Sequence, residues 1–543
     1  MRVRVRRGLA AAGAVVTAAA VLAGCGGSAT PTGGAQGDGR VRIAIPEPDA
    51  ITPTAADETA GIGIVHGLFT GLVAYDSRTA PVLTPLAKAV TTSDHQHWTV
   101  RLASGWTFHN GEAVTSSSFV DAWNYGALGT HGQYAGPFYA PIEGYDDVAP
   151  VDDSGEPLRP RAQTMRGLHV VDAHTFTVTL AHPDTTFLAE LGNPAFYPLP
   201  HVALTDPEGF AEAPVGNGPF RLGAWVPDQR VTLERFAGYR GTQPHVDGVD
   251  FTVYASMDTA VNDLASDAVD VVTGLSPSTL ARRAEFGDRY QTFPSSYFAF
   301  IGLPGFDPQL ADVRVRKAIS MSVDRATIAR TVFAGTRTPA DAFVGPSAPG
   351  YRPGSCGETC TYDPAAARAL FEAAGGAKTL PALSIRYNAD GPHRDWVVAA
   401  CHSVTDALGI PCRATPAADF PTLLDAMGKA AAAKKSFGAF RLAQTLDYPS
   451  VENYLTPLYS STGASNLVGY SNPRVDSLLA AGRSAASAER AQADWAQAED
   501  LVAADVPLVP LFFGQTTSLR SARVHDLSID AFESIDLVGL RVG

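Results

Sequence analysis

Segments with strand-like and helix-like patterns alternate along this chain, and no other feature limits its fold so strongly. In residues 98–102, the apolar Trp98, Val100 and Leu102 are separated by polar residues, which is the pattern of a strand with one buried face. Residues 175–180 repeat the alternation with threonines between apolar side chains. Both segments therefore predict strands that cover a core on one side only.

Helices are marked by their ends. Asp363 is a suitable N-cap, Pro364 fits the first helical position, and Gly375 ends the segment. Further helices are expected to begin at Asp312 and Asp324. Because both patterns are interspersed, we predict an α/β protein with mixed sheets. A mature chain of about 500 residues is longer than one hydrophobic core usually supports, so two or three domains are expected.

The N-terminus predicts export. Residues 1–24 combine a basic start with an Ala/Val-rich run from Leu9 to Leu22, as in a signal peptide. The Leu-Ala-Gly sequence before Cys25 resembles the lipobox of bacterial lipoproteins, which implies a diacylglyceryl group on Cys25 and cleavage before it. The run is short and Ala-rich for a transmembrane anchor. Residues 25–39 then form the lipidated cysteine and a flexible tether of small residues.

The charge of the chain argues against nucleic acid as a partner. The formal net charge is -14, and cleavage before Cys25 would remove four arginines and no acid, giving -18. A mature chain this acidic offers no basic groove that could bind the phosphates of a nucleic acid. No later apolar run is long enough to span a membrane.

Four cysteines remain after Cys25, and an even number in an exported chain favours disulfides. Three connectivities are possible, and we favour the pairs that are close in sequence, Cys356–Cys360 and Cys401–Cys412. A zinc site that uses His393 or His402 is the alternative, although the spacing fits no standard zinc template.

Catalytic motifs are missing from the sequence. It contains no GxSxG elbow, HExxH helix, Walker A loop or GxGxxG turn. We therefore expect no enzyme activity, no catalytic residues, no cofactor and no metal.

Several stretches, in order along the chain, resemble the substrate-binding proteins of ABC importers known as solute-binding family 5. They are HGLFTGLVAYD (66–76), FHNGEAVT (108–115), GNGPF (216–220), DVRVRKAI (312–319) and GYSNP (469–473). The resemblance covers nearly the whole mature chain and is closest to the oligopeptide-binding branch.

This resemblance implies a two-lobed α/β fold like that of periplasmic binding proteins (type II, cluster C), with an extra α/β domain on the first lobe. The implied first lobe comprises residues 40–69, 201–298 and 515–543. The extra domain comprises residues 70–200, and the second lobe residues 299–514. The two lobes are expected to close around a ligand.

The resemblance also implies the ligand-binding residues. Asp447 aligns with the acid that pairs with the α-ammonium group of a bound peptide, although an acid here could instead cap a helix or end a turn. The other implied positions are Ala443 and Thr445, which pair with peptide backbone, Tyr134 of the extra domain, Thr59, Thr273 and Gly274. Arg441 is expected to meet either a ligand carboxylate or a lobe residue. Gln444 departs from the family, whose closest relatives carry an aromatic residue there.

The implied function is that of a monomeric, lipid-anchored receptor on the extracytoplasmic face of a bacterial membrane, which delivers oligopeptides to the transmembrane subunits of an ABC permease. The same fold could bind a nickel complex, glutathione, an opine or a sugar. A cell-envelope chaperone and a secreted hydrolase are the alternatives from other classes, and the hydrolase lacks a nucleophile motif.

Overall fold

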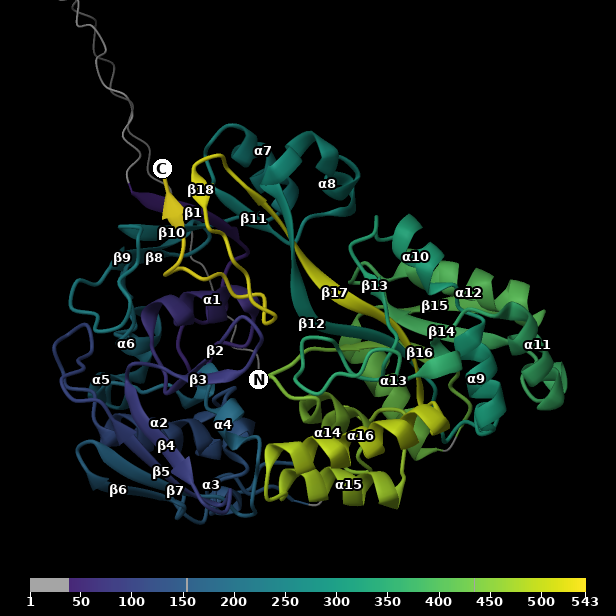
Figure 1. Ribbon diagram of the computed structural model, residues 1–543, viewed down its shortest axis with the longest axis horizontal. Coiled ribbons are helices and arrows are strands. Elements are labelled where there is room, and N and C mark those ends of the chain that lie inside the picture. The colour runs from purple at the N-terminus through teal and green to yellow at the C-terminus, as the bar shows by residue number, and fades with distance from the viewer. Residues whose placement is uncertain (1–38, 153–154, 434) are drawn as a thin grey trace, which may run out of the picture. The chain divides into compact units, whose positions relative to one another are not determined.

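A mixed sheet of 11 strands forms the framework of the molecule (Figure 1). The computed structural model describes residues 39–152, 155–433 and 435–543. In spatial order the strands are β15 (Cys412–Ala417), β14 (Leu383–Asn388), β16 (Ala439–Gln444), β12 (Tyr290–Gly302), β17 (Leu508–Arg520), β11 (Val271–Thr273), β1 (Arg40–Ile45), β10 (Gly248–Val253), β9 (Arg230–Arg235) and β8 (Phe220–Val226), with β13 (Thr338–Pro339) paired to β17.

Strands β12 and β17 connect the two halves of this sheet. Each has 13 residues, and they pair antiparallel from Tyr290 opposite Leu519 to Gly302 opposite Leu508. The ladder is interrupted by a bulge between Pro294 and Phe298. A bulge bends its strand and increases the local twist. The β12–β17 ribbon therefore joins two separate groups of packed elements with a local bend between them.

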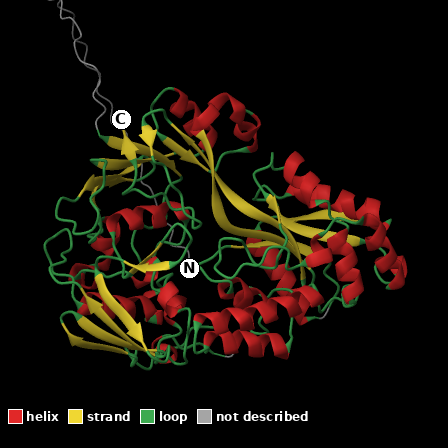
Figure 2. Cartoon of the chain, in the orientation of Figure 1, coloured by secondary structure: helices red, strands yellow, loops and turns green. Residues whose placement is uncertain are grey.

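Helices cover both faces of the sheet at the end that contains β14, β15 and β16 (Figure 2). Alternate residues of β12 point to opposite faces, since Phe298 and Phe300 belong to one core cluster and Ala299 and Ile301 to another. One face is covered by α9 (Val313–Met321), α10 (Arg325–Thr331), α11 (Pro364–Ala373) and α12 (Arg394–Leu408). The other is covered by α13 (Phe420–Ala432), α14 (Glu452–Tyr459), α15 (Pro473–Arg483) and α16 (Ala488–Asp505).

A second sheet has four antiparallel strands and lies within residues 70–200. Its order is β4 (Ala87–Thr92), β5 (His97–Leu102), β7 (Thr175–Thr179) and β6 (Leu168–Asp172). Trp98, Val100 and Leu102 of β5 are buried, as the alternation predicted. Trp123 of α2 (Ser116–Ala127) packs edge-on against Phe176 of β7. This sheet shares one continuous core with β1, β9 and β10 of the large sheet.

The remaining elements are short. They are α1 (Thr59–Leu68), α3 (Tyr145–Val148), α4 (Phe187–Glu190), α5 (His201–Thr205), α6 (Pro207–Glu212), α7 (Met257–Ala265), α8 (Pro277–Ala281), β2 (Val73–Tyr75), β3 (Pro81–Leu83), β18 (Val524–His525) and β19 (Arg541–Val542). No helix in the described ranges is both long and apolar enough to cross a bilayer. The predicted signal peptide, Cys25 and most of the tether lie outside the described residues.

The predicted helix starts are confirmed. The carboxylate of Asp363 accepts hydrogen bonds from the first-turn amides of α11, and Asp312 and Asp324 cap α9 and α10 in the same way. The structure pairs Cys356 with Cys360 and Cys401 with Cys412, the two pairs favoured from the sequence. The lobe boundaries given above stay predictions.

Asp270 holds three segments of the large sheet together next to β11. Its side chain is fully buried and binds Arg42 of β1 at 2.8 Å, while Ser521, just after β17, donates to it at 2.9 Å. Burial raises the pKa of this carboxyl, but the hydrogen bonds from Arg42 and Ser521 outweigh it and lower the pKa below 3.8.

We expect Asp270→Asn to lower the free energy of unfolding by about 3 kcal/mol, because it removes the buried negative charge that Arg42 approaches at 2.8 Å and Arg523 at 3.6 Å. Calorimetry at pH 7 measures this loss. Since the folded-state pKa is depressed, the contribution of Asp270 is present above its ordinary pKa and disappears as the pH falls through the folded value. The difference in free energy of unfolding between wild type and variant should therefore shrink in acid. A difference that stays constant at every pH would contradict this role.

Candidate functional site

Asp447 lies in the segment that leaves β16 and enters α14. Its backbone N–H donates to Oδ1 of Asn453 at 2.7 Å, and its carbonyl accepts from Nδ2 of Asn193 at 3.2 Å. Asn453 belongs to α14, whereas Asn193 follows α4 in the region of the four-stranded sheet. The main chain of Asp447 is thus fixed between two parts of the molecule that are far apart in sequence.

The carboxyl group of Asp447 is accessible to solvent yet surrounded by protein. Burial raises its pKa above the ordinary value, and contact with the Asn453 side chain acts in the opposite direction. Within the described part of the chain, no lysine or arginine forms an ion pair with it. It does not cap α14 either, because the N-cap residue of that helix is Val451. Asp447 is therefore a solvent-accessible carboxyl group that has no basic partner among the described residues.

Two tyrosines from residues 70–200 face this carboxyl. Tyr134 is 54% exposed, and its pKa is raised by burial and then by the negative charges of Asp447 and Asp57. Tyr75 donates its hydroxyl to the carbonyl of Ala189 at 2.8 Å, and Asp447 is among the acids that raise its pKa. The structure therefore brings the predicted residues Asp447 and Tyr134 together.

The edge of β16 next to Asp447 is only partly covered. On one side β16 pairs with β12 from Phe440 to Gln444. On the other side its pairing with β14 is limited to Ala439 and Phe440. The following residues, which include the predicted Ala443 and Gln444, thus present an edge that the β14 ladder does not reach. Thr445 is exposed, and its carbonyl accepts from the Gln444 side chain at 3.1 Å.

Arg441 marks the other end of this edge. It is half-buried, and Nη1 donates to Oδ1 of Asn388 at 2.9 Å. Its guanidinium lies 5.8 Å from the ring centre of Phe420. Burial and then the charge of Arg441 lower the pKa of His393 to about 4. Among the described residues Arg441 binds the amide of Asn388 and forms no ion pair.

The remaining predicted residues lie on other elements. Thr59 is the exposed first residue of α1. Thr273 ends β11, and Gly274 follows with φ of 65°, donating its N–H to the carbonyl of Thr517 at 3.1 Å. No contact joins these three to Asp447 within the described residues. Their role in ligand binding stays a prediction.

Several residues around Asp447 were not predicted from the sequence. Asn193 and Asn453 lie in none of the quoted motifs, and Tyr75 lies in the stretch 66–76 without having been predicted as a site residue. The proximity of these residues to Asp447 depends on tertiary contacts between distant segments. Burial periodicity could have identified Asn453 as an inward-facing polar residue of a helix, since it is only 4% exposed. Nothing local connects Asn193 to Asp447.

Comparison with known proteins identifies relatives along most of the chain. The family model described as "Bacterial extracellular solute-binding proteins, family 5 Middle" matches residues 82–466. The periplasmic oligopeptide-binding protein OppA of Escherichia coli K12 is 26% identical, with 86% of this chain and 85% of the relative covered. A probable deoxycholate-binding periplasmic protein, YgiS, of the same organism is 25% identical, with 86% of both chains covered.

Solved structures have the same fold. The unliganded open form of the murein tripeptide-binding protein MppA superposes with a TM-score of 0.79 at 21% identity, covering 93% of this chain and 97% of the other. OppA of Haemophilus influenzae in complex with RPPGFSPFR gives a TM-score of 0.69 at 22% identity, covering 93% and 99%. These likenesses confirm the predicted two-lobed α/β fold.

Proposed function

The chain belongs to family 5 of the bacterial extracellular solute-binding proteins, and on this premise we propose that it captures oligopeptides and delivers them to the transmembrane subunits of an ABC permease. The observation that carries the proposal is Asp447, an uncompensated carboxylate beside an uncovered strand edge. A charged group that the surrounding protein partly desolvates is costly without a partner. The α-ammonium group of a peptide would supply that partner.

The rest of the peptide would lie along β16. An extended ligand can add a strand to an open edge, and its backbone hydrogen bonds provide affinity that does not depend on side chains. Ala443 and Thr445 are the residues we assign to this pairing. Gln444 lies between them and would face the neighbouring ligand side chain in place of an aromatic residue.

The length of the ligand follows from the two ends of this edge. Arg441 precedes Asp447 by six residues, and its guanidinium has no carboxylate partner among the described residues. Six extended steps of roughly 3.3 Å span at most about 20 Å. A peptide whose ammonium group binds Asp447 and whose carboxylate binds Arg441 would therefore contain no more than about six residues.

Ligand binding would be coupled to closure of the two lobes. In this proposal the second lobe (299–514) supplies Asp447, and the extra domain (70–200) supplies Tyr134 on the opposite side. The first lobe (40–69, 201–298 and 515–543) supplies Thr59, Thr273 and Gly274. A ligand that contacts both sides stabilises the closed arrangement by its differential affinity for that state.

We further propose that the protein is anchored by its N-terminus. Export by residues 1–24 and lipidation of Cys25 would place it on the outer face of the cytoplasmic membrane. A diacylglyceryl group supplies two acyl chains, and stable anchoring takes more than one. The tether that ends at residue 39 would let the receptor move over the membrane and reach its permease.

Native mass spectrometry and calorimetry together test the peptide assignment. We expect the purified protein to retain a ladder of peptide masses, and an added tripeptide with a free amine to bind at least tenfold more tightly than its N-acetylated form, since only the free amine can neutralise Asp447. Equal affinity for the two forms would refute the amine site. A single retained mass that is not a peptide would indicate one of the non-peptide ligands.

A further inference from the structure

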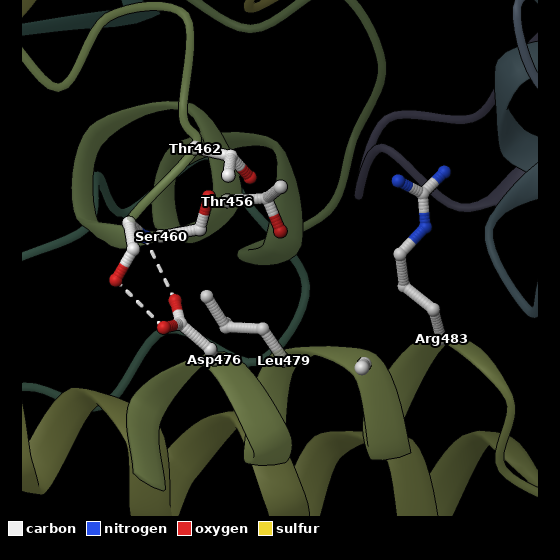
Figure 3. Close-up of a pocket in the computed structure, with 8 residues that line it drawn as sticks. Thr456, Ser460, Thr462, Asp476, Leu479 and Arg483 are labelled. Atoms are coloured by element: carbon white, nitrogen blue, oxygen red, sulfur yellow. Dashed lines mark hydrogen bonds between the residues drawn. The ribbon is translucent and has the colours of Figure 1, made fainter. Parts of the chain in front are cut away.

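One arginine and three carboxylates meet between the end of α15 and the region that contains α4. Arg483 Nε lies 3.0 Å from Asp184 Oδ2, and its terminal nitrogens lie 3.6 Å from both Glu190 and Glu452. The acids are nearly inaccessible, with side chains 5%, 7% and 1% exposed. Figure 3 shows Arg483 extending from α15 beside a pocket lined by the hydroxyl groups of Thr456, Ser460 and Thr462. We call these four charged residues the Arg483 cluster.

The hydrogen bonds of the cluster require an additional proton. The hydroxyl oxygen of Thr186 lies 2.6 Å from Asp184 Oδ1 and 2.7 Å from Glu190 Oε1. One hydroxyl can donate only one proton, so two charged carboxylates would leave one of these short contacts repulsive. A protonated Glu190 can donate to the Thr186 oxygen while Thr186 donates to Asp184. Every contact is then satisfied.

The charges of the cluster agree with this assignment. A single guanidinium cannot neutralise three buried carboxylates, and an uncompensated buried charge is strongly unfavourable. Burial, followed by the charges of Asp184 and Glu452, raises the pKa of Glu190 to about 8, although Arg483 and Thr186 act in the opposite direction. Tyr75 and Tyr448 also face these acids, and their hydroxyls stay protonated because burial raises the pKa of both.

The cluster is connected directly to Asp447. Tyr448, the next residue, donates its hydroxyl to Oε2 of Glu452 at 2.6 Å. Backbone contacts reinforce the junction, because Thr185 donates its N–H to the carbonyl of Arg483 at 2.8 Å. The Asn193 side chain bonds the carbonyl of Asp447 from the same region as Asp184 and Glu190. Loss of the Arg483–Asp184 contact would release the segment that fixes Asp447.

We propose that the Arg483 cluster is a proton-dependent latch that holds residues 184–193 against the second lobe and positions Asp447 for the ligand. Arg483 and Glu190 are positioning residues in this scheme, since they act through Tyr448, Glu452 and Asn193. The link to ligand affinity rests on the proposed function. The latch itself does not.

The direction of the pH effect follows from the proton on Glu190. When the latch opens, Glu190 becomes exposed and its pKa returns towards 4.5, so the closed state binds more protons than the open state. The contribution of Glu190 to the latch is therefore fully present below pH 4.5 and declines as the pH rises towards 8. At most, the equilibrium constant for closing the latch falls about tenfold for each unit rise in pH.

Glu190→Gln tests the latch without disturbing its shape, because glutamine is an uncharged replica of the protonated acid. Hydrogen exchange at the Thr185 amide reports the latch in the absence of any ligand. We expect wild type and Glu190→Gln to exchange alike at pH 4.5, and wild type to exchange faster than the variant by up to about tenfold for each pH unit above that, until about pH 8. Glu212→Gln, a change of an exposed glutamate in α6, is the matched control and should follow wild type at both pH values. Equal exchange of wild type and Glu190→Gln at pH 8 would overturn the latch.

Calorimetry with a free-amine tripeptide tests the link to the binding site. The affinities of the two proteins should differ less at pH 6 than at pH 8, where the wild type should bind at least tenfold more weakly than Glu190→Gln. Comparison at one pH cancels the titration of the peptide amine and of Asp447. An exchange difference with equal affinities at pH 8 would overturn the positioning role. Failure of both proteins to bind peptide at pH 6 would instead refute the proposed function, while the exchange difference would still support the latch.

Discussion

Replacing Asp447 by asparagine is expected to weaken the binding of peptides with a free α-amine by about 2–4 kcal/mol, roughly 30-fold to 1000-fold. The structure places this carboxyl between Tyr134, Tyr75 and Asn453 with no basic partner among the described residues. Asparagine keeps the shape but cannot compensate the ammonium charge. Because the carboxyl is accessible to solvent, we expect the loss to lie below that of a fully buried ion pair. Isothermal titration calorimetry with one tripeptide measures it.

The same experiment contains its controls. N-acetylated peptide should lose almost nothing, since it has no charge to place against residue 447. Asp228→Asn is a matched change at an exposed turn between β8 and β9, where asparagine tolerates the positive φ of 61°. It should bind like wild type. If Asp447→Asn weakened both forms of the peptide equally, the carboxylate would be supporting the fold of the loop and not the ligand amine.

Much of the local structure could be predicted from the sequence because it depends on neighbouring residues. The alternation in 98–102 produced a strand whose apolar side chains are buried. Asp312, Asp324 and Asp363 cap helices through amides only two or three residues away. These interactions need no knowledge of the rest of the chain.

The site was harder to predict, because it depends on strand order and on contacts between distant segments. The open edge of β16 exists because β14 pairs with it only at Ala439 and Phe440, a register that no local pattern encodes. Asn193 reaches Asp447 across 254 positions of sequence. The resemblance could supply Asp447 itself but not the residues that fix it.

Arg325 is expected to be among the residues most important for the stability of the protein, although its partners in the described part of the chain are uncharged. It is 3% exposed, and its guanidinium donates to the carbonyls of Pro510, Ser320, Val323 and Cys360 and to the Ser320 hydroxyl. These acceptors join β17, the end of α9 and the disulfide-bonded loop that contains Cys360. No acid forms an ion pair with Arg325 in the described part of the chain.

Burial lowers the pKa of Arg325 to about 9, so the side chain is still charged at neutral pH. Methionine has a similar length but no donors. Arg325→Met would leave several buried carbonyls without partners, at a cost of about 1–3 kcal/mol for each group that water cannot reach. We expect a loss of at least 4 kcal/mol in the free energy of unfolding of the second lobe, measured by calorimetry or by denaturant unfolding.

Arg330→Met is the matched control, because it lies on the same helix, is exposed and makes one side-chain contact, to the Thr327 hydroxyl at 3.1 Å. Its effect should stay within about 0.5 kcal/mol. Arg325→Lys should fall between the two, since a single ammonium group cannot reproduce the planar fork of five donors. If Arg325→Met were as stable as Arg330→Met, water would have to replace the guanidinium at every carbonyl. The side chain of Arg325 would then contribute only its volume, and its positive charge would not be needed to satisfy these carbonyl groups.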